Sequence, residues 1–424
     1  MRILLLGSGG REHALAWKIS QSPLCTKLFI APGNAGTLSL GDNRAIAVTD
    51  FVAIRDLCKE EKIDMAVVGP EEPLVKGIVD FLHEDSSLQS LMIIGPGEMG
   101  AQLEGSKAFA KSFMQRHGIP TASYREFTAD NYEEGCSYLQ NHPLPIVLKA
   151  DGLAAGKGVL ICETHEAALQ GFEEMLRASK FGEAGKKVVV EQFLKGIEIS
   201  VFVLTDGRHY ILLPEAKDYK RIGVGDTGLN TGGMGAVSPV PFVDTALWNK
   251  IEERVVKPTI DGLAKDGIPY CGFVFIGFMI VGNDPYVIEY NCRMGDPETE
   301  VVIPRLQNDL VELLLAAAKG ELPAKKLEVD PRTACTVVAV SGGYPENYQK
   351  GFTITGLDKK SESLVFHMGT SLKEGQVVTS GGRVLAVTSF ANNIPQAAAV
   401  SFQRQQEILF EGKYYRGDIG FEFN

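Results

Sequence analysis

The sequence contains no apolar run that approaches the length of a membrane span, and its N-terminus lacks the charged region and cleavage site of a signal peptide. Its seven cysteines form no CxxC pair and no cluster with the spacing of metal ligands, and their number is odd. Such cysteine usage is typical of a reducing compartment. These absences predict a cytoplasmic protein without a membrane partner.

The chain also lacks an excess of positive charge, since 42 lysines and arginines stand against 53 aspartates and glutamates and give a formal net charge of -11. Binding along a nucleic-acid backbone depends on a basic surface that releases counterions. The charge balance therefore excludes broad contact with nucleic acid. Any recognition of phosphate must be local.

Hydrophobic residues are abundant, at 45% of 424 residues, which allows about three domains at roughly 150 residues each. Residues 1–103 alternate short apolar runs with amphipathic segments, and the runs end in Gly or Pro turns. This rhythm predicts an α/β domain with a Rossmann-like parallel sheet. Ligands gather at the carboxyl ends of such strands, so we expect the turns to carry function.

A second domain is predicted to begin at about residue 104. Ser106 predicts the N-cap of a helix in which Phe109 and Phe113 lie one turn apart and which ends near Gly118. The following strands show period-two alternation and are joined by glycine-rich connections. This pattern favours an α+β arrangement.

A polar segment with two prolines, residues 320–333, separates this body from a final part that is rich in strands. We therefore expect three domains: residues 1–103, 104–325 and 326–424.

The first glycine turn follows an apolar strand and opens a helix. It matches the dinucleotide-binding pattern G-x-G-x-x-G at Gly7 and Gly9, but Glu12 occupies the third position, and no carboxylate closes the second strand. The turn therefore disfavours NAD. Two interpretations remain, a helix N-terminus that receives a small anion such as phosphate and a tight turn that only packs helix on strand.

Two further glycine-rich segments lie downstream. Gly152, Gly156 and Gly158 surround Lys157, but the spacing and the missing Ser or Thr exclude a standard P-loop. This segment is either a mobile cover whose backbone N–H groups bind nucleotide phosphates or a plain hairpin loop. Residues 223–235 contain six glycines, too many for a helix or strand interior, and predict close approach to a ligand or a disordered surface loop.

Polar side chains interrupt two apolar strands. Glu191 ends one strand and Glu198 opens the next. The free backbone groups of a buried strand end suit an adenine edge, and a nearby carboxylate either binds ribose hydroxyls or is simply solvated. Farther along, alternation places Glu289, Asn291 and Arg293 on one face of a strand. Carboxylate and amide oxygens suit Mg²⁺, and arginine suits a transferring phosphoryl group or an anionic intermediate.

Together these residues resemble the glycinamide ribonucleotide synthetase family of the ATP-grasp superfamily. The resemblance runs from end to end and rests, in order, on the segments GGREHALAW, APGNAGT, VGPEEPLVKGIVD, QLEGSKAFAK, LKADGLAAGKGV, DYKR, NTGGMGA and NCRMGDPE. It implies an N-terminal sheet domain, a central ATP-grasp domain with a mobile small lobe at about 121–190, and a C-terminal strand-rich domain.

The resemblance also implies a reaction. ATP, glycine and 5-phosphoribosylamine would give ADP, phosphate and glycinamide ribonucleotide through a glycyl phosphate, as a step of de novo purine biosynthesis. Such chemistry depends on positioning and charge neutralisation rather than on a covalent protein intermediate. The expected cofactors are ATP and Mg²⁺ or Mn²⁺, and the expected state is a monomer.

The resemblance further implies roles for residues of this sequence, which fall into four groups. The ATP-binding residues would be Lys107, Lys149, Gly152, Gly156, Lys157, Gly158, Glu191, Phe193, Leu194, Glu198, Lys220 and Asn230. The metal ligands would be Glu289 and Asn291. The catalytic residues would be Arg293, Asp296 and Lys157. The substrate-binding residues would be Gly9, Gly10, Asn34, Gly36, Asp218 and Arg293, the first four of them at the ribose phosphate.

Lys217 departs from the family pattern, in which many members have Gln, and we expect its charge beside Asp218 to affect how glycine is held. Two alternatives stay open. Another ATP-grasp carboxylate–amine ligase would share the nucleotide site but differ in its acceptor, which the N-terminal turn disfavours. A nucleotide-binding regulator without catalysis is disfavoured by four intact residues, Lys149, Glu289, Asn291 and Arg293.

Overall fold

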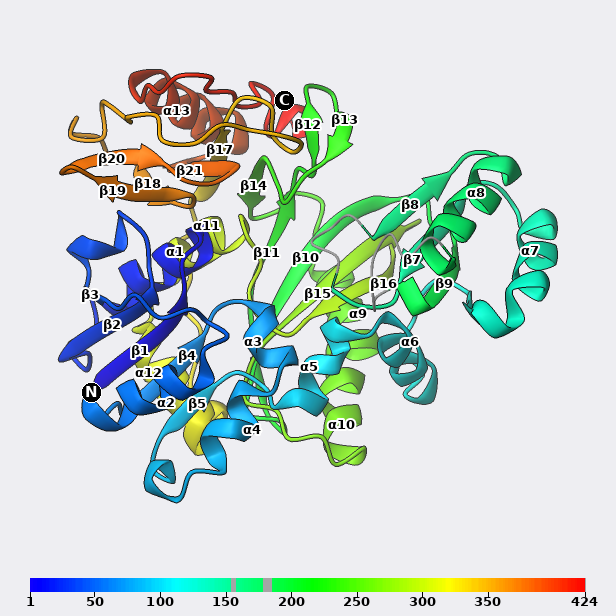
Figure 1. Ribbon diagram of the computed structural model, residues 1–424, viewed down its shortest axis with the longest axis horizontal. Coiled ribbons are helices and arrows are strands. Elements are labelled where there is room, and N and C mark those ends of the chain that lie inside the picture. Colours follow the sequence, from blue (N-terminus) through cyan, green and yellow to red (C-terminus); the bar gives the residue numbers. More distant parts are fainter. Residues whose placement is uncertain (154–157, 178–184, 424) are drawn as a thin grey trace.

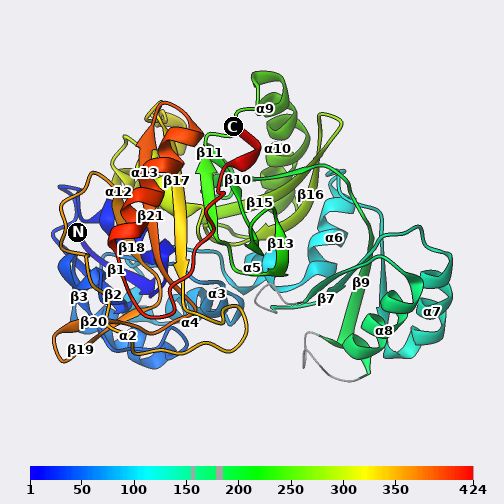
Figure 2. The ribbon, with the colours of Figure 1, turned by 90° about the horizontal axis from the view of Figure 1, so that it is seen from above.

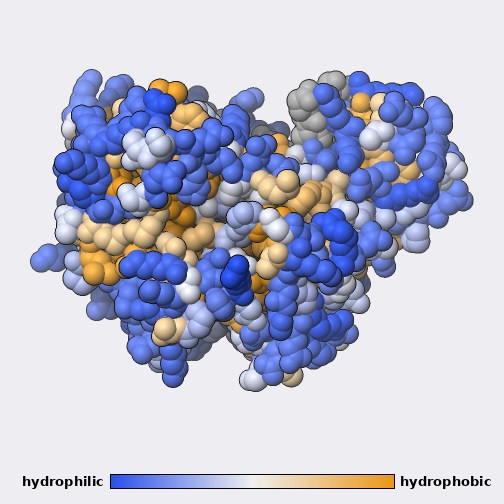
Figure 3. All heavy atoms as spheres, turned by 90° about the horizontal axis from the view of Figure 1, so that it is seen from below, coloured by the Kyte–Doolittle hydropathy of each residue, from blue (hydrophilic) through white to orange (hydrophobic). Residues whose placement is uncertain are grey.

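The computed structural model describes residues 1–153, 158–177 and 185–423, and it contains a five-stranded, an eight-stranded and a four-stranded sheet together with two two-stranded ribbons (Figure 1). No helix in these ranges is long and apolar enough to cross a membrane. The face seen from below is mostly hydrophilic, with apolar side chains in a band across its middle (Figure 3).

The N-terminal sheet has the strand order β3-β2-β1-β4-β5, and all of its pairings are parallel. Its strands are β1 (Arg2–Gly7), β2 (Lys27–Pro32), β3 (Asp42–Asn43), β4 (Met65–Val68) and β5 (Met92–Ile94). Its helices are α1 (Gly10–Ile19), α2 (Phe51–Glu60), α3 (Glu71–Val75), α4 (Ile78–His83) and α5 (Glu98–Gly105). Leu4 and Leu6 of β1 pack in the core with α2 and α4, whereas Ile3 and Leu5 pack in the core with α1. The predicted parallel α/β sheet is confirmed.

The eight-stranded sheet has the order β16-β15-β10-β11-β14-β17-β21-β18, with antiparallel neighbours. Its strands are β10 (Ile197–Thr205), β11 (Tyr210–Asp218), β14 (Gly235–Ser238), β15 (Gly272–Val281), β16 (Asp284–Asn291), β17 (Thr333–Val340), β18 (Leu364–His367) and β21 (Arg383–Ala391). Because β14 pairs with β17, one sheet spans the polar segment near residue 325.

Within the described residues, six further α-helices and the two-stranded ribbon β19-β20 pack with this sheet. They are α6 (Lys107–Arg116), α9 (Thr245–Ile251), α10 (Lys257–Lys265), α11 (Thr299–Val302), α12 (Leu310–Lys319), α13 (Ile394–Glu407), β19 (Thr370–Lys373) and β20 (Gln376–Thr379). As predicted, Ser106 caps α6, since its hydroxyl oxygen accepts a hydrogen bond from the N–H of Phe109.

A four-stranded sheet forms the lobe that projects from the rest of the molecule in both ribbon views (Figures 1 and 2). Its order is β6-β9-β7-β8, with antiparallel pairings. The elements are β6 (Tyr124–Thr128), α7 (Tyr132–Asn141), β7 (Ile146–Ala150), β8 (Val159–Cys162), α8 (His165–Leu176) and β9 (Lys187–Gln192). The second glycine loop connects the paired strands β7 and β8, and Gly156 and Lys157 lie outside the described residues.

The prediction that residues 223–235 are too rich in glycine for strands is wrong. β12 (Arg221–Gly223) and β13 (Thr227–Asn230) form a hairpin, and β14 is an interior strand of the large sheet. A Cβ at Gly235 would lie 2.6 Å from the carbonyl oxygen of Thr336, and one at Gly233 would lie 2.4 Å from the ring of Pro297. These glycines allow close approach to neighbouring chain segments.

Candidate functional site

A cavity of about 150 Å³ lies where β7 and β9 of the small lobe meet α6 and β16. It brings together eight of the predicted site residues, namely Lys107, Lys149, Gly152, Gly158, Glu191, Glu289, Asn291 and Arg293. Residues that the sequence prediction did not single out complete its wall, and Glu71, Glu104 and Lys111 carry the charge among them.

Two lysines converge on one oxygen of Glu191. Lys149 Nζ lies 3.0 Å from Glu191 Oε2 and donates to the carbonyl oxygen of Ile288 at 2.9 Å. Lys111 Nζ lies 3.1 Å from the same oxygen. Glu191 is only 3% exposed, so the interpretation of a solvated residue at a strand end is wrong for it. Burial is tolerated because two cations compensate the carboxylate.

Lys107, the first residue of α6, donates from Nζ to the carbonyl oxygen of Gly152 at 2.9 Å. Burial lowers its pKa, and the neighbouring Glu289 opposes that shift. The ammonium group therefore stands between the glycine loop and β16, where an anionic ligand in the cavity would meet it.

Arg293 is held by two carboxylates. Its Nη2 lies 2.5 Å from Glu104 Oε1, and its Nε lies 3.1 Å from Glu71 Oε2. Burial by itself would raise the pKa of Glu71, but Arg293 and Arg11 lower it to about 2. The arrangement fixes a guanidinium at the cavity wall before any ligand binds.

Strand alternation placed Arg293 on a strand with Glu289 and Asn291, and that placement is wrong in detail. β16 ends at Asn291, and Arg293 lies two residues beyond it, where the N–H of Cys292 donates to Glu104 at 2.8 Å. Glu289 and Asn291 do line the cavity from β16. Their carboxylate and amide oxygens fit Mg²⁺ or Mn²⁺, which take hard oxygen ligands.

A second charged group is formed by β10, the end of β11 and the residue Lys220, which lies between β11 and β12. Lys220 Nζ lies 2.6 Å from Glu198 Oε2 and 4.0 Å from Asp218 Oδ1. Burial raises the pKa of Asp218. Burial would lower the pKa of Lys220, but Asp218, Glu198 and Glu289 raise it well above its ordinary value. Lys217 Nζ, in contrast, lies 2.6 Å from Glu422 Oε1. The side-chain carboxylate of Glu422 therefore compensates the charge that Lys217 places beside Asp218.

The predicted anion-binding turn at Gly9 and Gly10 opens α1 at the carboxyl end of β1. The N–H of Gly9 already donates to Glu12 Oε2 at 2.6 Å, and a Cβ at Gly10 would lie 2.2 Å from Glu300 Oε1. Asn34 stabilises the neighbouring loop, because its Oδ1 accepts from the N–H of Gly36 at 2.8 Å.

Asp296 lies between the N-terminal and C-terminal parts of the chain. Its Oδ2 accepts from the N–H of Arg11 at 3.3 Å, and its Oδ1 lies 2.9 Å from Arg383 of β21. Phe193 and Leu194 are half-buried after β9, and Asn230 is exposed on β13. These three residues are absent from the described lining of the cavity.

The three charged residues that were not predicted differ in their sequence signal. Lys111 follows Lys107 by four positions, which places both on one face of α6. Glu71 and Glu104 are far from Arg293 in the sequence, and no local pattern pairs residues at such separations.

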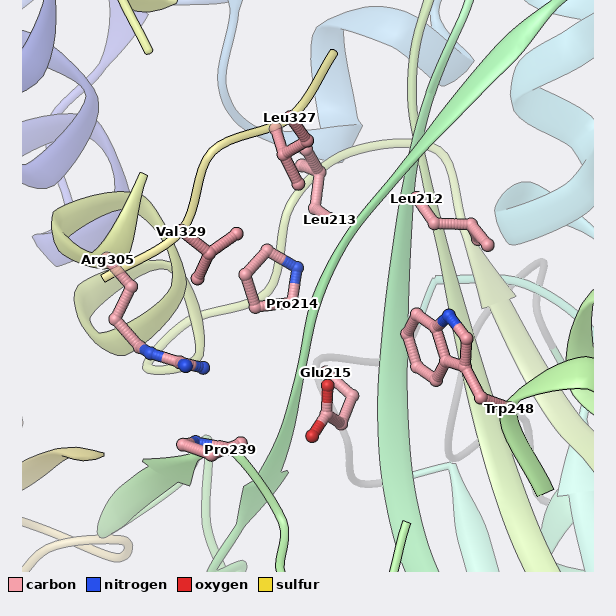
Figure 4. Close-up of a pocket in the computed structure, with 9 residues that line it drawn as sticks. All are labelled: Leu212, Leu213, Pro214, Glu215, Pro239, Trp248, Arg305, Leu327 and Val329. Atoms are coloured by element: carbon pink, nitrogen blue, oxygen red, sulfur yellow. The ribbon is translucent and has the colours of Figure 1, made fainter. Parts of the chain in front are cut away.

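A second cavity, of about 190 Å³, lies against β11 and α9 and is lined by Pro214, Trp248 and Val329 among others (Figure 4). Its two charged side chains already form hydrogen bonds with other residues of the protein. Glu215 Oε1 accepts from the N–H of Val240 at 3.0 Å, and Arg305 Nη1 donates to Ser238 Oγ at 2.7 Å. We therefore take the first cavity as the candidate site.

Comparison with known proteins agrees along the whole chain. The family models described as phosphoribosylglycinamide synthetase match with their N domain at residues 1–104, their ATP-grasp (A) domain at 105–299 and their C domain at 334–422. The chain is 48% identical over 427 residues to a phosphoribosylamine–glycine ligase of Escherichia coli O6:H1 (strain CFT073), covering 99% of this chain and 98% of that protein. It is 46% identical over 426 residues to the protein of that name from Vibrio vulnificus (strain CMCP6), with the same coverage.

Solved structures agree as well. The crystal structure of the phosphoribosylamine–glycine ligase of Thermotoga maritima matches with a TM-score of 0.85 and 34% identity, over 99% of this chain and 100% of that one. The biotin carboxylase domain of the Hydrogenobacter thermophilus 2-oxoglutarate carboxylase matches with a TM-score of 0.74 and 17% identity, over 97% and 91%. The second likeness concerns the fold alone.

Proposed function

Because the chain belongs to the phosphoribosylglycinamide synthetase family, we infer that it is an ATP-dependent phosphoribosylamine–glycine ligase of purine biosynthesis. Its substrates are then glycine and 5-phosphoribosylamine, and we propose that it acts as a monomer. The similarity across 99% of the chain to ligases of that name carries the inference. The cavity that combines lysines, hard oxygen donors and an arginine supports it.

For the nucleotide, we propose that the ammonium groups of Lys107 and Lys149 neutralise phosphate charge, since both reach the same cavity. The remaining ATP-binding residues of this proposal are Gly152, Gly156, Lys157, Gly158, Glu191, Phe193, Leu194, Glu198, Lys220 and Asn230. Among these, Gly156 and Lys157 lie outside the described residues.

Glu289 and Asn291 would hold Mg²⁺ or Mn²⁺ at the wall that also carries Lys107 and Lys149. Two protein oxygens leave coordination sites for phosphate oxygens and water, as is usual for Mg²⁺ at a nucleotide. When bound, the metal would neutralise charge on the phosphates. Every other part of the chemistry falls to the side chains.

In the proposed reaction, a carboxylate oxygen of glycine attacks the γ-phosphorus of ATP. The bond between this phosphorus and the oxygen that leaves with ADP breaks, which gives glycyl phosphate. The amine nitrogen of 5-phosphoribosylamine then attacks the carbonyl carbon, the bond to phosphate breaks, and the nitrogen loses a proton. Arg293 and Asp296 would face the acyl phosphate. Arg293 suits this role because Glu71 and Glu104 orient its charge in advance.

We assign the glycine ammonium to Asp218, whose carboxylate lies beside Lys220. The ribose phosphate would meet the turns that hold Gly9, Gly10, Asn34 and Gly36 at the carboxyl ends of β1 and β2. Carboxyl ends of parallel strands are the usual place for a ligand in such a sheet.

The test is ADP release from MgATP with glycine and 5-phosphoribosylamine generated in the assay, for the natural chain and for Arg293→Ala. We expect turnover that requires both substrates and falls at least about 100-fold in the variant, as when an oriented stabiliser of a developing anion is lost. ATP binding, measured by calorimetry, should persist in the variant.

Arg254→Ala is the matched control, because Arg254 forms an exposed pair with Asp284 at the start of β16. It should retain full turnover. ADP release that is indifferent to glycine would contradict the ligase, and full turnover in Arg293→Ala would remove Arg293 from the chemical step.

A further inference from the structure

Lys111 is a buried lysine of α6 that the proposed chemistry does not use, and its side chain is 2% exposed. Its Nζ lies 3.1 Å from Glu191 Oε2 and donates to Thr121 Oγ1 at 2.8 Å. A buried ammonium without a carboxylate partner would be strongly unfavourable. Glu191 therefore accounts for the presence of Lys111 at this place.

Glu191, however, already has another partner. Lys149 Nζ lies 3.0 Å from the same carboxylate oxygen, so two cations share one anion. The group carries a net positive charge in a buried place, and burial lowers the pKa of Lys111 to about 8 although Glu191 opposes that shift. Neutralising one carboxylate does not require two lysines, which suggests that they have separate tasks.

The two lysines differ in their access to a ligand. Lys149 lies on β7, and its other contact is a backbone carbonyl, that of Ile288. Lys111 is anchored on both sides, by Thr121 and by Glu191. Lys149 can exchange its bonds for nucleotide phosphates, but only if Glu191 keeps a counter-ion when Lys149 leaves.

We propose that Lys111 is a positioning residue for the nucleotide: it remains the counter-ion of Glu191 and thereby releases Lys149 to bind the phosphates of ATP. The inference rests on the proposed function, since it needs ATP in this cavity. The second carboxylate oxygen of Glu191, Oε1, is consistent with this arrangement. It is buried, it has no hydrogen-bond partner within the described ranges, and its residue lines the cavity, so it remains available to a donor on the ligand.

The experiment measures dissociation constants of MgATP and of adenosine by calorimetry, without glycine or amine. In Lys111→Met, Lys149 becomes the sole counter-ion of Glu191, so we expect ATP to bind at least about 10-fold more weakly. Adenosine, which has no phosphate, should change less than about 2-fold. A general loosening of the cavity would weaken both ligands.

A second variant separates positioning from packing. In Lys111→Met combined with Glu191→Gln, no carboxylate retains Lys149, and ATP affinity should recover most of the loss. Lost packing at position 111 would not be rescued by a change at position 191.

The matched control is Lys413→Met. Burial also lowers the pKa of Lys413 to about 8, but its Nζ donates to backbone carbonyls of the C-terminal part, including that of Ile408 at 2.6 Å.

Unchanged ATP affinity in Lys111→Met, or the absence of recovery in the double variant, would overturn the proposal while leaving the ligase intact. Failure of the natural chain to bind MgATP would overturn the proposed nucleotide site together with this inference. Equal weakening of ATP and adenosine would assign Lys111 to packing alone and overturn its role at the phosphates.

Discussion

His13 of α1 accepts, through Nδ1, a hydrogen bond from the backbone N–H of His367 at 2.7 Å, and Asn34 donates to the carbonyl oxygen of His367 at 2.8 Å. Single side chains thus join the first helix to a strand near the C-terminus. Burial lowers the pKa of His13 to about 3 and that of His367 to about 4. Both rings are therefore neutral at neutral pH, and the accepting role of His13 depends on that state.

This pair predicts a loss of stability in weak acid. Since both folded-state pKa values lie below 6.5, the unfolded chain binds more protons between pH 6.5 and about 4, and stability falls as pH drops through that window. Each histidine should contribute about 1.4 kcal/mol per pH unit. Urea denaturation between about pH 7.5 and 5.5 measures the slope.

His13→Asn, which keeps an acceptor, should lose about half of this pH dependence. His83→Gln changes an exposed histidine and should keep the slope of the natural chain. Identical slopes in the natural chain and in His13→Asn would show that the buried pair does not carry the effect.

Among the elements, α6 shows how a local signal can place functional groups. Ser106 caps the helix by accepting from the N–H of Phe109 at 3.1 Å, and its hydroxyl donates to Asp151 at 3.0 Å. The cap fixes where the helix begins, and the helical period then directs Lys107 and Lys111 to one cavity. Both features could be inferred from the sequence, but the partners of the lysines could not.

Ser106→Ala should destabilise the protein by about 1 kcal/mol, because the helix loses its cap and Asp151 loses a donor. Chemical denaturation measures the change. Ser112→Ala, in the interior of the same helix, is the control and should stay within about 0.5 kcal/mol of the natural chain. Equal effects of both substitutions would mean that capping is not what Ser106 contributes.

One interior strand could not be identified from its local pattern. β14 contains only small residues and valine, yet it is an interior strand, because β11 and β17 supply backbone partners on both of its edges. The alternation in β10 does predict a strand, but the structure buries both of its faces, with Val201 and Val203 in one core and Phe202 and Leu204 in another. In β14 the tertiary environment outweighs propensity, whereas in β10 it decides only that both faces are buried.

At the scale of the whole molecule, the eight-stranded sheet joins the central and C-terminal parts (Figure 2). β14 pairs with β17 over four residues, and Thr388 of β21 donates from its hydroxyl to the carbonyl oxygen of Glu300 at 2.9 Å. The C-terminal strands therefore complete the sheet that carries β10, β11 and β16. They also supply Arg383, which contacts Asp296.

A chain that ends at residue 325 should accordingly fail to form a stable, ATP-binding protein. Removing β17 leaves β14 as an unpaired edge, and exposed edges promote aggregation. Size-exclusion chromatography and calorimetry with MgATP compare it with the full chain. A monomeric residue 1–325 fragment that binds ATP as tightly as the full chain would contradict this expectation.

The sequence by itself determined the parallel N-terminal sheet, the capped α6 and the family, because apolar periodicity, caps and closely spaced motifs are local properties of a chain. Only the tertiary structure decided that Glu71 and Glu104 fix Arg293, that Lys111 shares Glu191 with Lys149, and that one sheet runs across residue 325. Charge compensation and strand pairing act between residues that are distant in sequence. Folding alone brings those partners within bonding distance.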